Sequence, residues 1–234
     1  MNAGSNWLAF DTSTEVLSLG LSVQGRLQVR TLPGGAQASA SLIPNALEML
    51  AQAGLGLGQL QAIVFGRGPG SFTGLRTACA VAQGLAFGAG IPVLPVDTLL
   101  AVAEGARLQS GVQDEPLTVL ALLDARMDEV YSAAYDWNGR AWLARGPLQV
   151  GPPEQVVLPG AARVLIAGNA CDVYGARLPA GQSLRVLPGA EALLTLAPAL
   201  WAQGLAVPAE QAMPLYIRDK VAQTTAEREA ARGQ

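Results

Sequence analysis

Short apolar runs separated by polar turns predict most of the strands in this chain. Residues 7–10 form a buried run that ends at the polar turn Asp11–Thr14, and residues 16–23 alternate as a second strand. A hairpin turn at 24–26 leads into a third strand over 27–30, and further strands are expected at 62–65, 92–96, 117–123, 129–135, 142–150 and 164–168. A helical period predicts helices over 41–53, 74–87, 98–108 and 190–203. Strands alternating with helices are typical of α/β proteins.

Capping residues and prolines locate some of the helix ends. Ser39 or Ser41 can cap the helix at 41–53, which leaves Pro44 tolerable only in its first turn. Pro198 is expected to kink or interrupt the helix at 190–203. From Thr224 the chain is polar and helix-prone, and a frayed tail is expected there.

A short internal echo predicts two lobes of the same kind. Phe10-Asp11 is followed by a turn and then by Glu-Val-x-Ser, and Leu123-Asp124 is followed by the same pattern with one residue inserted. Each copy places an aspartate at the end of a buried strand and opens a second strand after it. We therefore expect a duplicated β-meander in two lobes. The polar segment 110–116 divides them into an N-terminal lobe, 1–109, and a C-terminal lobe, 110–234, whose last segment can pack back on the first lobe.

The composition is that of a well-packed globular chain. Half of the 234 residues are hydrophobic and 14% are charged, but no apolar run approaches the roughly 18 residues of a membrane span. The N-terminus has no basic residue and no long apolar stretch, so a cytoplasmic protein is expected. Cys79 and Cys171 have no CxxC partner, which favours two buried free thiols over a disulfide or a zinc site.

The absence of histidine limits the chemistry that this chain can perform. The sequence contains no histidine, which excludes Ser-His-Asp and Cys-His nucleophiles and the common two-histidine metal sites. Carboxylate chemistry is not excluded. The formal net charge is −3 and no basic stripe is present, so RNA contact would depend mainly on another protein. We expect no catalytic residue, no cofactor and no metal.

A glycine-rich loop between a predicted strand and a predicted helix has two interpretations. The segment 66–74 could hold an anion with backbone amides at the start of a helix. It lacks the Lys-Ser/Thr ending of a P-loop, and Pro69 has no amide hydrogen to donate. A tight strand-to-helix turn is therefore favoured. The alternative is a phosphate-binding arrangement, whose candidate residues are Asp11, Thr12, Ser13, Gly68, Gly70, Ser71 and Thr73.

The helix that follows this loop is apolar on most sides. Between residues 75 and 87 only Arg76, Thr77 and Gln83 are clearly polar, and many other positions are small. A helix of this kind must be covered on most sides, by its own sheet and by either more of the chain or another subunit. We favour a helical interface with a partner over a purely internal core. The predicted interface residues are Leu42, Ile43, Ala46, Leu47, Leu50, Leu75, Ala78, Cys79, Ala82 and Ala86.

Four segments together resemble the TsaB (YeaZ) family. The most specific is Gly66–Arg76, which reads GRGPGSFTGLR; the others are LAFDTSTE at 8–15, DARMDEVY at 124–131 and PLYIR at 214–218. They follow the family's order and reach from the first strand to residue 221. Family members often carry a histidine before the first helix, where this chain has Gln37-Ala38-Ser39. That residue is not catalytic in the family.

The resemblance implies a two-lobed actin/Hsp70/sugar-kinase fold. It also implies a role in making N6-threonylcarbamoyladenosine at position 37 of tRNA, as a non-catalytic partner that binds and activates a TsaD-type enzyme. A TsaE-type ATPase belongs to the same system, tRNA is reached through the complex, and the chain alone forms a homodimer. The family places its protein contacts on helices 41–53 and 74–87. Direct tRNA contact by Arg67 or Arg76 is left open.

Two other functions compete with this one. A small sugar or acyl kinase of the same superfamily would use Asp11 to position a metal and the loop 68–73 to grip phosphate, but 234 residues are few for such an enzyme. A peptidase would need a group that activates its nucleophile or holds zinc, and the chain has no histidine for either task.

Overall fold

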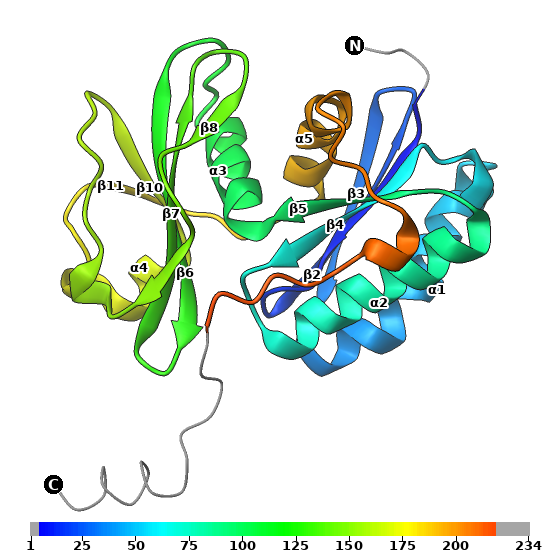
Figure 1. The fold of residues 1–234 in the computed structure, drawn as a ribbon, viewed down its shortest axis with the longest axis horizontal. Helices are drawn as coiled ribbons and strands as arrows, with labels where there is room; N and C mark the ends of the chain where they lie inside the picture. Colours follow the sequence, from blue (N-terminus) through cyan, green and yellow to red (C-terminus); the bar gives the residue numbers. More distant parts are fainter. Residues whose placement is uncertain (1–4, 219–234) are drawn as a thin grey trace, which may run out of the picture.

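The computed structural model describes residues 5–218, which form two α/β lobes side by side (Figure 1). The first lobe contains a five-stranded sheet in the order β3-β2-β1-β4-β5. β1 pairs antiparallel with β2 and parallel with β4. The strands are β1 (Trp7–Asp11), β2 (Val16–Val23), β3 (Arg26–Pro33), β4 (Ala62–Gly68) and β5 (Val93–Asp97).

The second lobe repeats this topology. Its sheet has the order β11-β10-β6-β7-β8, and β9 also pairs with β7. β6 pairs antiparallel with β7 and parallel with β10, as β1 does with β2 and β4. The duplicated two-lobed fold is confirmed. The strands are β6 (Leu117–Arg126), β7 (Glu129–Trp137), β8 (Trp142–Ala144), β9 (Gln149–Gly151), β10 (Val164–Gly168) and β11 (Gln182–Arg185).

The two longest helices cover the outer face of the first sheet (Figure 1). Side chains from both helices share one core with alternate residues of β1, β2 and β4, including Phe10, Leu19 and Ile63. None of the helices in residues 5–218 combines the length and apolar character that a membrane crossing requires. The helices are α1 (Ala38–Gln52), α2 (Phe72–Ala89), α3 (Thr98–Gln109), α4 (Ala170–Tyr174) and α5 (Ala190–Ala202).

The inner faces of the sheets are covered by helices that cross between the lobes. α3 follows the first sheet in sequence but packs on the second, where Val102 and Ala106 join the core of β6. α5 follows the second sheet and packs on the first, with Leu193 against β1, β4 and β5. A side chain at Gly20 on β2 would lie 2.9 Å from Ala190, so glycine allows α5 to approach. The boundary expected near residue 110 lies between the two sheets in the sequence. The core of each sheet nevertheless contains residues from both halves of the chain.

α1 begins earlier than the sequence suggested and contains its proline. It starts at Ala38, so Pro44 is its seventh residue, and neither Ser39 nor Ser41 caps it. Pro44 removes the bond to the carbonyl of Ala40, but Ala40 is exposed and water can satisfy that group. Asn45 also donates to the Ser41 carbonyl at 2.8 Å, which supports the turn around the proline.

The second lobe departs from the predicted elements in three places. The strand expected at 142–150 is two short strands, β8 and β9, because Gly146-Pro147 interrupts it and proline cannot donate to a ladder. β11 and α4 were not predicted, since β11 is mostly exposed and shows no apolar period. The tail predicted from Thr224 lies outside the described residues.

A buried ion pair fastens α3 to the second sheet. Glu104 and Arg107 are both buried, and the Arg107 guanidinium donates to both carboxylate oxygens of Glu104 at 2.7 and 2.8 Å. Trp142 of β8 donates its indole N–H to Glu104 at 2.8 Å. Arg107 also donates to the Val112 carbonyl and lies 4.5 Å from the ring centre of Trp137. Each polar atom of the pair thus has a partner in the second lobe or on its own helix.

Breaking this pair should destabilise the whole molecule. Glu104→Gln leaves the Arg107 charge buried without its counter-charge, so the free energy of unfolding should fall by about 3 kcal/mol or more. The exposed pair of Arg30 and Glu48 is the matched control, and Glu48→Gln should change stability little. Urea denaturation of both variants measures the difference, and equal losses would contradict the role given to Glu104.

Candidate functional site

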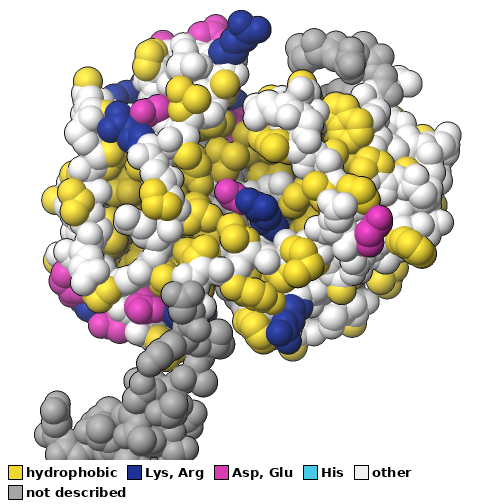
Figure 2. Space-filling model, viewed as in Figure 1, with side chains coloured by type: hydrophobic (Ala, Val, Ile, Leu, Met, Phe, Trp, Pro, Cys, Tyr) yellow, Lys and Arg dark blue, Asp and Glu magenta, His cyan; other side chains and the backbone are white. Residues whose placement is uncertain are grey.

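The two lobes enclose a cavity of about 450 Å³ at the end where both sheets present equivalent turns. The β1–β2 turn and the start of α2 line one side, the β6–β7 turn lines the other, and residues 215–218 pass between them. Hydrophobic side chains gather along the boundary of the lobes, with few charged side chains among them (Figure 2). The lining residues include Ser13, Phe72, Asp124, Met127, Asn169 and Tyr216.

On the first lobe, the two segments predicted to bind phosphate pack on each other. The Thr12 hydroxyl donates to the Gly74 carbonyl at 2.6 Å, deep in the protein. The backbone amide of Ser71 donates to the Ser13 carbonyl at 2.8 Å. A side chain at Gly70 would collide with Ser13, at 2.6 Å. The β1–β2 turn and the glycine-rich loop therefore pack as one unit.

The Asp11 carboxylate is locked inside this unit. It is fully buried, and its Oδ1 accepts bonds from the amide and the hydroxyl of Ser13, at 2.8 and 2.6 Å. Its Oδ2 has no hydrogen-bond partner within residues 5–218, and it lies 1.8 Å from the position where a side chain of Gly66 would begin. Burial raises the pKa of Asp11 from 3.8 to about 6, although the bonds from Ser13 act in the opposite direction.

The equivalent turn of the second lobe has a different anchor. The Asp124 carboxylate accepts from the amide of Arg126 at 2.9 Å and from the hydroxyl of Tyr174 at 2.8 Å. Burial and this bond to Asp124 raise the pKa of Tyr174 to about 12. Three consecutive residues adopt a left-handed backbone, with φ of 60°, 54° and 62° at Arg126, Met127 and Asp128. Non-glycine residues in that region are uncommon, so the turn is held by its surroundings.

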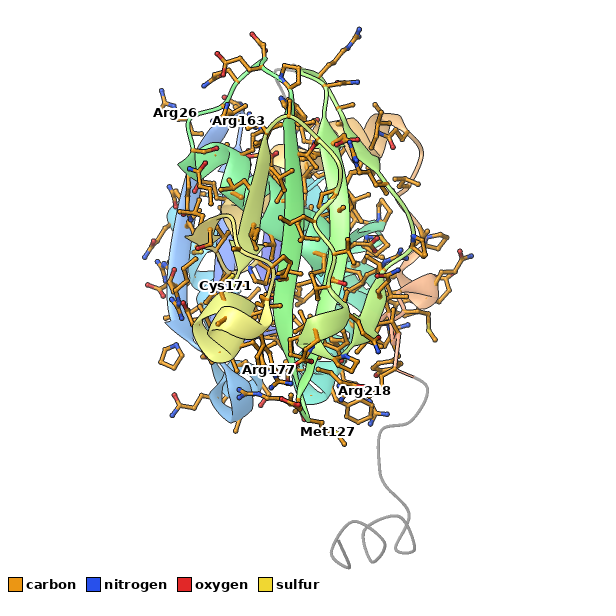
Figure 3. The ribbon with its side chains drawn as sticks, turned by 90° about the vertical axis from the view of Figure 1, so that its left-hand side faces the viewer. Arg26, Met127, Arg163, Cys171, Arg177 and Arg218 are labelled. Atoms are coloured by element: carbon orange, nitrogen blue, oxygen red, sulfur yellow. The ribbon has the colours of Figure 1, made fainter. Side chains whose placement is uncertain are left out.

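Two arginines brace this turn from outside. Arg177 pairs with both carboxylate oxygens of Asp128, at 2.5 and 2.8 Å, and lowers the pKa of that carboxyl. Arg218 donates to the Ala125 carbonyl at 3.0 Å and pairs with Glu129. Met127, Arg177 and Arg218 lie together at one end of the second lobe, whereas Arg163 lies at the opposite end (Figure 3).

The segment after α5 returns across the first lobe and reaches the second. The Leu215 amide donates to the Arg67 carbonyl at 2.7 Å, and the Cys79 thiol lies 3.3 Å from the Ala212 carbonyl. Tyr216 packs on Phe72 with ring centres 5.4 Å apart. Sequence reasoning treated 214–218 only as part of the family resemblance. Within that short motif, the aromatic Tyr216 and the charged Arg218 were the signal in the sequence for a contact at the cavity.

The two arginines considered for tRNA contact have different surroundings. Arg67 pairs with Asp97 at 2.6 Å, and the Asp97 carboxylate makes no cap hydrogen bond to α3. Arg76 is exposed, lies 3.8 Å from the ring centre of Phe72, and donates to the Tyr216 hydroxyl at 3.2 Å. Of these two arginines, only Arg76 has no acidic partner among the described residues, and it contacts Phe72 and Tyr216, which line the cavity.

Most of the residues predicted for a partner interface lie in the core. Only Ile43 and Leu47, with exposed fractions of 38% and 44%, reach the surface. Both helices are amphipathic as predicted, but their apolar sides face the chain's own sheet. The predicted interface residues on those sides are therefore corrected to core residues. The buried members are Leu42, Ala46, Leu50, Leu75, Ala78, Cys79, Ala82 and Ala86.

The outer sides of the same helices nevertheless present an apolar surface. On α1, Ile43, Pro44 and Leu47 are exposed on successive turns. In the middle of α2 the exposed positions Ala80 and Gly84 are small, and nothing lies within 4 Å of a side chain built at Gly84. Near the end of the helix, the Phe87 side chain is 74% exposed. Partner binding by α1 and α2 stays a prediction. The residues predicted to make the contact are now the outward-facing ones on these helices.

The cavity does not fit the nucleotide that its fold implies. A phosphate chain would need free amides, hydroxyls and a carboxylate that can approach a metal. The Asp11 carboxylate is buried, the Ser13 hydroxyl donates to it, and the amide of Gly68 donates to Thr98 at 3.1 Å. The described residues contain no cluster of acidic or cysteine side chains that could hold a metal ion. These hydrogen bonds occupy several of the groups that the kinase alternative would need for phosphate.

Duplicated sheets, crossing helices and a cavity between equivalent turns define a two-lobed protein of the actin-like fold. YeaZ from Pseudomonas aeruginosa matches this structure with a TM-score of 0.84 and 40% identity, over 91% of this chain and all of that one. The chain belongs to the TsaB (YeaZ) family. A second structure from the same organism, described as similar to peptidase YeaZ, matches with a TM-score of 0.83 and 40% identity over 92% of this chain and all of that one.

Sequence relatives support the same family. The tRNA threonylcarbamoyladenosine biosynthesis protein TsaB of Escherichia coli K12 is 35% identical over 92% of this chain and 95% of its own length. The protein of the same name from Haemophilus influenzae is 36% identical over 92% and 94%. A family model described as TsaD, tRNA N6-adenosine threonylcarbamoyltransferase, matches residues 34–163.

The buried Asp11 should make stability depend on pH. Its pKa is higher in the folded chain than in the unfolded chain, so stability is lost as the pH rises from about 4 to about 6. Asp11→Asn should remove this loss and stabilise the chain at pH 7–8 by up to about 3 kcal/mol. Thermal melts of both chains from pH 4 to 8 test this, and parallel profiles would show that Asp11 does not titrate in this range.

Proposed function

We propose that this chain is a non-catalytic subunit that binds and activates a TsaD-type enzyme during threonylcarbamoyl transfer to adenosine 37 of tRNA. The observation that carries the proposal is full-length similarity, at 35–36% identity, to two proteins named for tRNA threonylcarbamoyladenosine biosynthesis. Their coverage exceeds nine-tenths on both sides, so no separate catalytic domain of those relatives is missing from the match.

The chemistry of the chain supports a role without catalysis. The sequence contains no histidine, and the aspartate at the end of β1 is enclosed by Ser13 and Gly66. A peptidase, the activity named for one structural relative, would need an activated nucleophile or a zinc site. A transfer enzyme would need exposed groups that hold the phosphate of an acyl-adenylate, and those on the first lobe bind each other.

The outward side of α1 and α2 is the surface that we assign to the enzyme. Ile43 and Leu47 supply apolar contact, and the small residues of α2 allow a partner helix to approach closely. A homodimer of the isolated chain would use the same surface, so the two assemblies would exclude each other. A TsaE-type ATPase joins the assembled pair, tRNA is held mainly by the other subunits, and the complex acts in the cytoplasm.

Reconstitution tests the activating role directly. The purified chain alone should transfer no threonylcarbamoyl group, and it should raise transfer when added to TsaD-type and TsaE-type partners with tRNA and threonylcarbamoyl-AMP. Product formation on tRNA is the measurement. Full transfer by the partners in the absence of this chain would contradict the proposal.

A single charge on α1 should separate binding from folding. Leu47→Glu places a carboxylate in the assigned interface and should weaken the complex with the TsaD-type partner at least tenfold, about 1.4 kcal/mol. Val157→Glu, at an exposed valine of the second lobe, is the control and should leave the affinity unchanged. Titration calorimetry gives both affinities, and thermal melts show whether each variant is folded. Equal affinities would place the partner on another surface.

A further inference from the structure

The mouth of the interlobe cavity carries two exposed aromatic rings beside an arginine. Phe72, at the first turn of α2, and Tyr216, on the returning segment, have exposed fractions of 41% and 45%. Their ring centres are 5.4 Å apart with 36° between the planes. Arg76 lies 3.8 Å from the Phe72 ring centre and donates to the Tyr216 hydroxyl at 3.2 Å. The cluster joins residues 140 positions apart in the sequence, so it forms only in the folded chain.

The opposite side of the mouth adds a second arginine and a flexible apolar side chain. Arg126 and Met127 are exposed at the tip of the β6–β7 turn and line the cavity. Their left-handed backbone is held by the bonds of Asp124 to Arg126 and Tyr174. The turn is therefore held in one conformation at the cavity. Arg126 pairs with Asp124 at 3.3 Å, and the Met127 sulfur lies 3.6 Å from Arg218.

The interior of the cavity offers a hydrogen-bonding amide. Asn169 lines the cavity, and its Oδ1 accepts from the Asp124 backbone amide at 2.9 Å. This bond orients the side chain, whose NH₂ group has no hydrogen-bond partner among the described residues. The cavity thus combines a donor inside with planar rings and arginines at its mouth. Its volume of about 450 Å³ is within the usual range for ligand pockets.

We propose that this mouth binds an unpaired nucleotide of RNA, with its base packed against the exposed edge of the Phe72–Tyr216 ring pair and its phosphates near Arg76 and Arg126. Aromatic platforms flanked by arginine are the chemistry that recognises splayed bases in single-stranded RNA. The inference rests on the proposed function, since RNA is the substrate of the assembled enzyme. It assigns this acidic chain one local contact, while other subunits supply most of the electrostatic attraction.

The chemistry of the mouth favours RNA over a free nucleotide. A free nucleoside triphosphate needs the grip on its phosphates that the first-lobe turn does not offer, because those groups bind each other. A base within an RNA chain is instead delivered by the rest of the bound molecule, and weak local stacking is then sufficient. RNA and a free nucleotide would both place a base against these rings, so the experiment must distinguish between the two ligands.

Binding of an unmodified tRNA transcript to the complex of the full chain with its TsaD-type partner tests the proposal. Phe72→Leu and Tyr216→Leu remove the ring planes and should each weaken RNA binding about tenfold. Arg76→Gln should lower the slope of log affinity against log salt by about one. The matched controls are Leu143→Ala and Arg163→Gln, two exposed positions of the second lobe away from the cavity, and they should change neither quantity.

The outcomes separate this inference from the proposed function. AMP and ATP, added as free competitors at millimolar concentration, should not displace the tRNA. Unchanged RNA affinity in the Phe72 and Tyr216 variants, with complex assembly intact, would overturn the inference and leave the proposed function standing. Loss of partner binding with unchanged RNA affinity would identify the cluster as a protein contact and also overturn it. Displacement of RNA by free AMP would show a mononucleotide site instead. Failure of the unsubstituted chain to form the complex would contradict the proposed function itself.

Discussion

The packing of α3 and α5 across the lobes is the constraint on which the rest of the structure depends. Each sheet has an inner apolar face, and each face is buried by a helix from the other half of the chain. The Glu104–Arg107 pair and Trp142 fix one of these helices, and the close approach of Ala190 to Gly20 positions the other. Because the lobes share their cores in this way, the two equivalent turns are held opposite each other and the cavity between them persists.

The same duplication explains why the two turns differ in what they can do. On the first lobe, Asp11 and Ser13 form hydrogen bonds with each other and the turn packs against the glycine-rich loop, so its polar groups brace the fold. On the second lobe, Asp124 is anchored by Tyr174, while Arg126 and Met127 remain exposed. The two equivalent turns therefore differ, because the polar groups of one are bonded to each other and the side chains of the other are exposed. This difference supports the proposal of a subunit that assists a reaction performed by its partner.

Much of the fold could be predicted from the sequence because its signals are local. The strands of the first meander follow apolar runs and alternation, and the echo around Asp11 and Asp124 predicted the repeated lobe. The crossing of α3 and α5 could not be predicted, since an apolar helix face does not reveal which sheet it covers. For the same reason Leu42 and Ala78 were assigned to a partner although they face the chain's own sheet. At the site, a tight glycine-rich turn was the favoured interpretation. The motif at 214–218 marked Tyr216, but it did not reveal the long-range return that brings this residue to the cavity.

The first lobe cannot complete its core until α5 has been synthesised, because α5 covers the inner face of its sheet. The first sheet is complete once β5 has been made, but its inner face stays uncovered until residues 190–202 emerge, about a hundred residues later. During that interval a growing chain exposes Trp7, Val64 and Leu94. The nascent lobe is therefore a natural client for chaperones that shield apolar surface. A chain that ended before α5 would leave this apolar face uncovered, so the first lobe depends on the second half of the chain for its core.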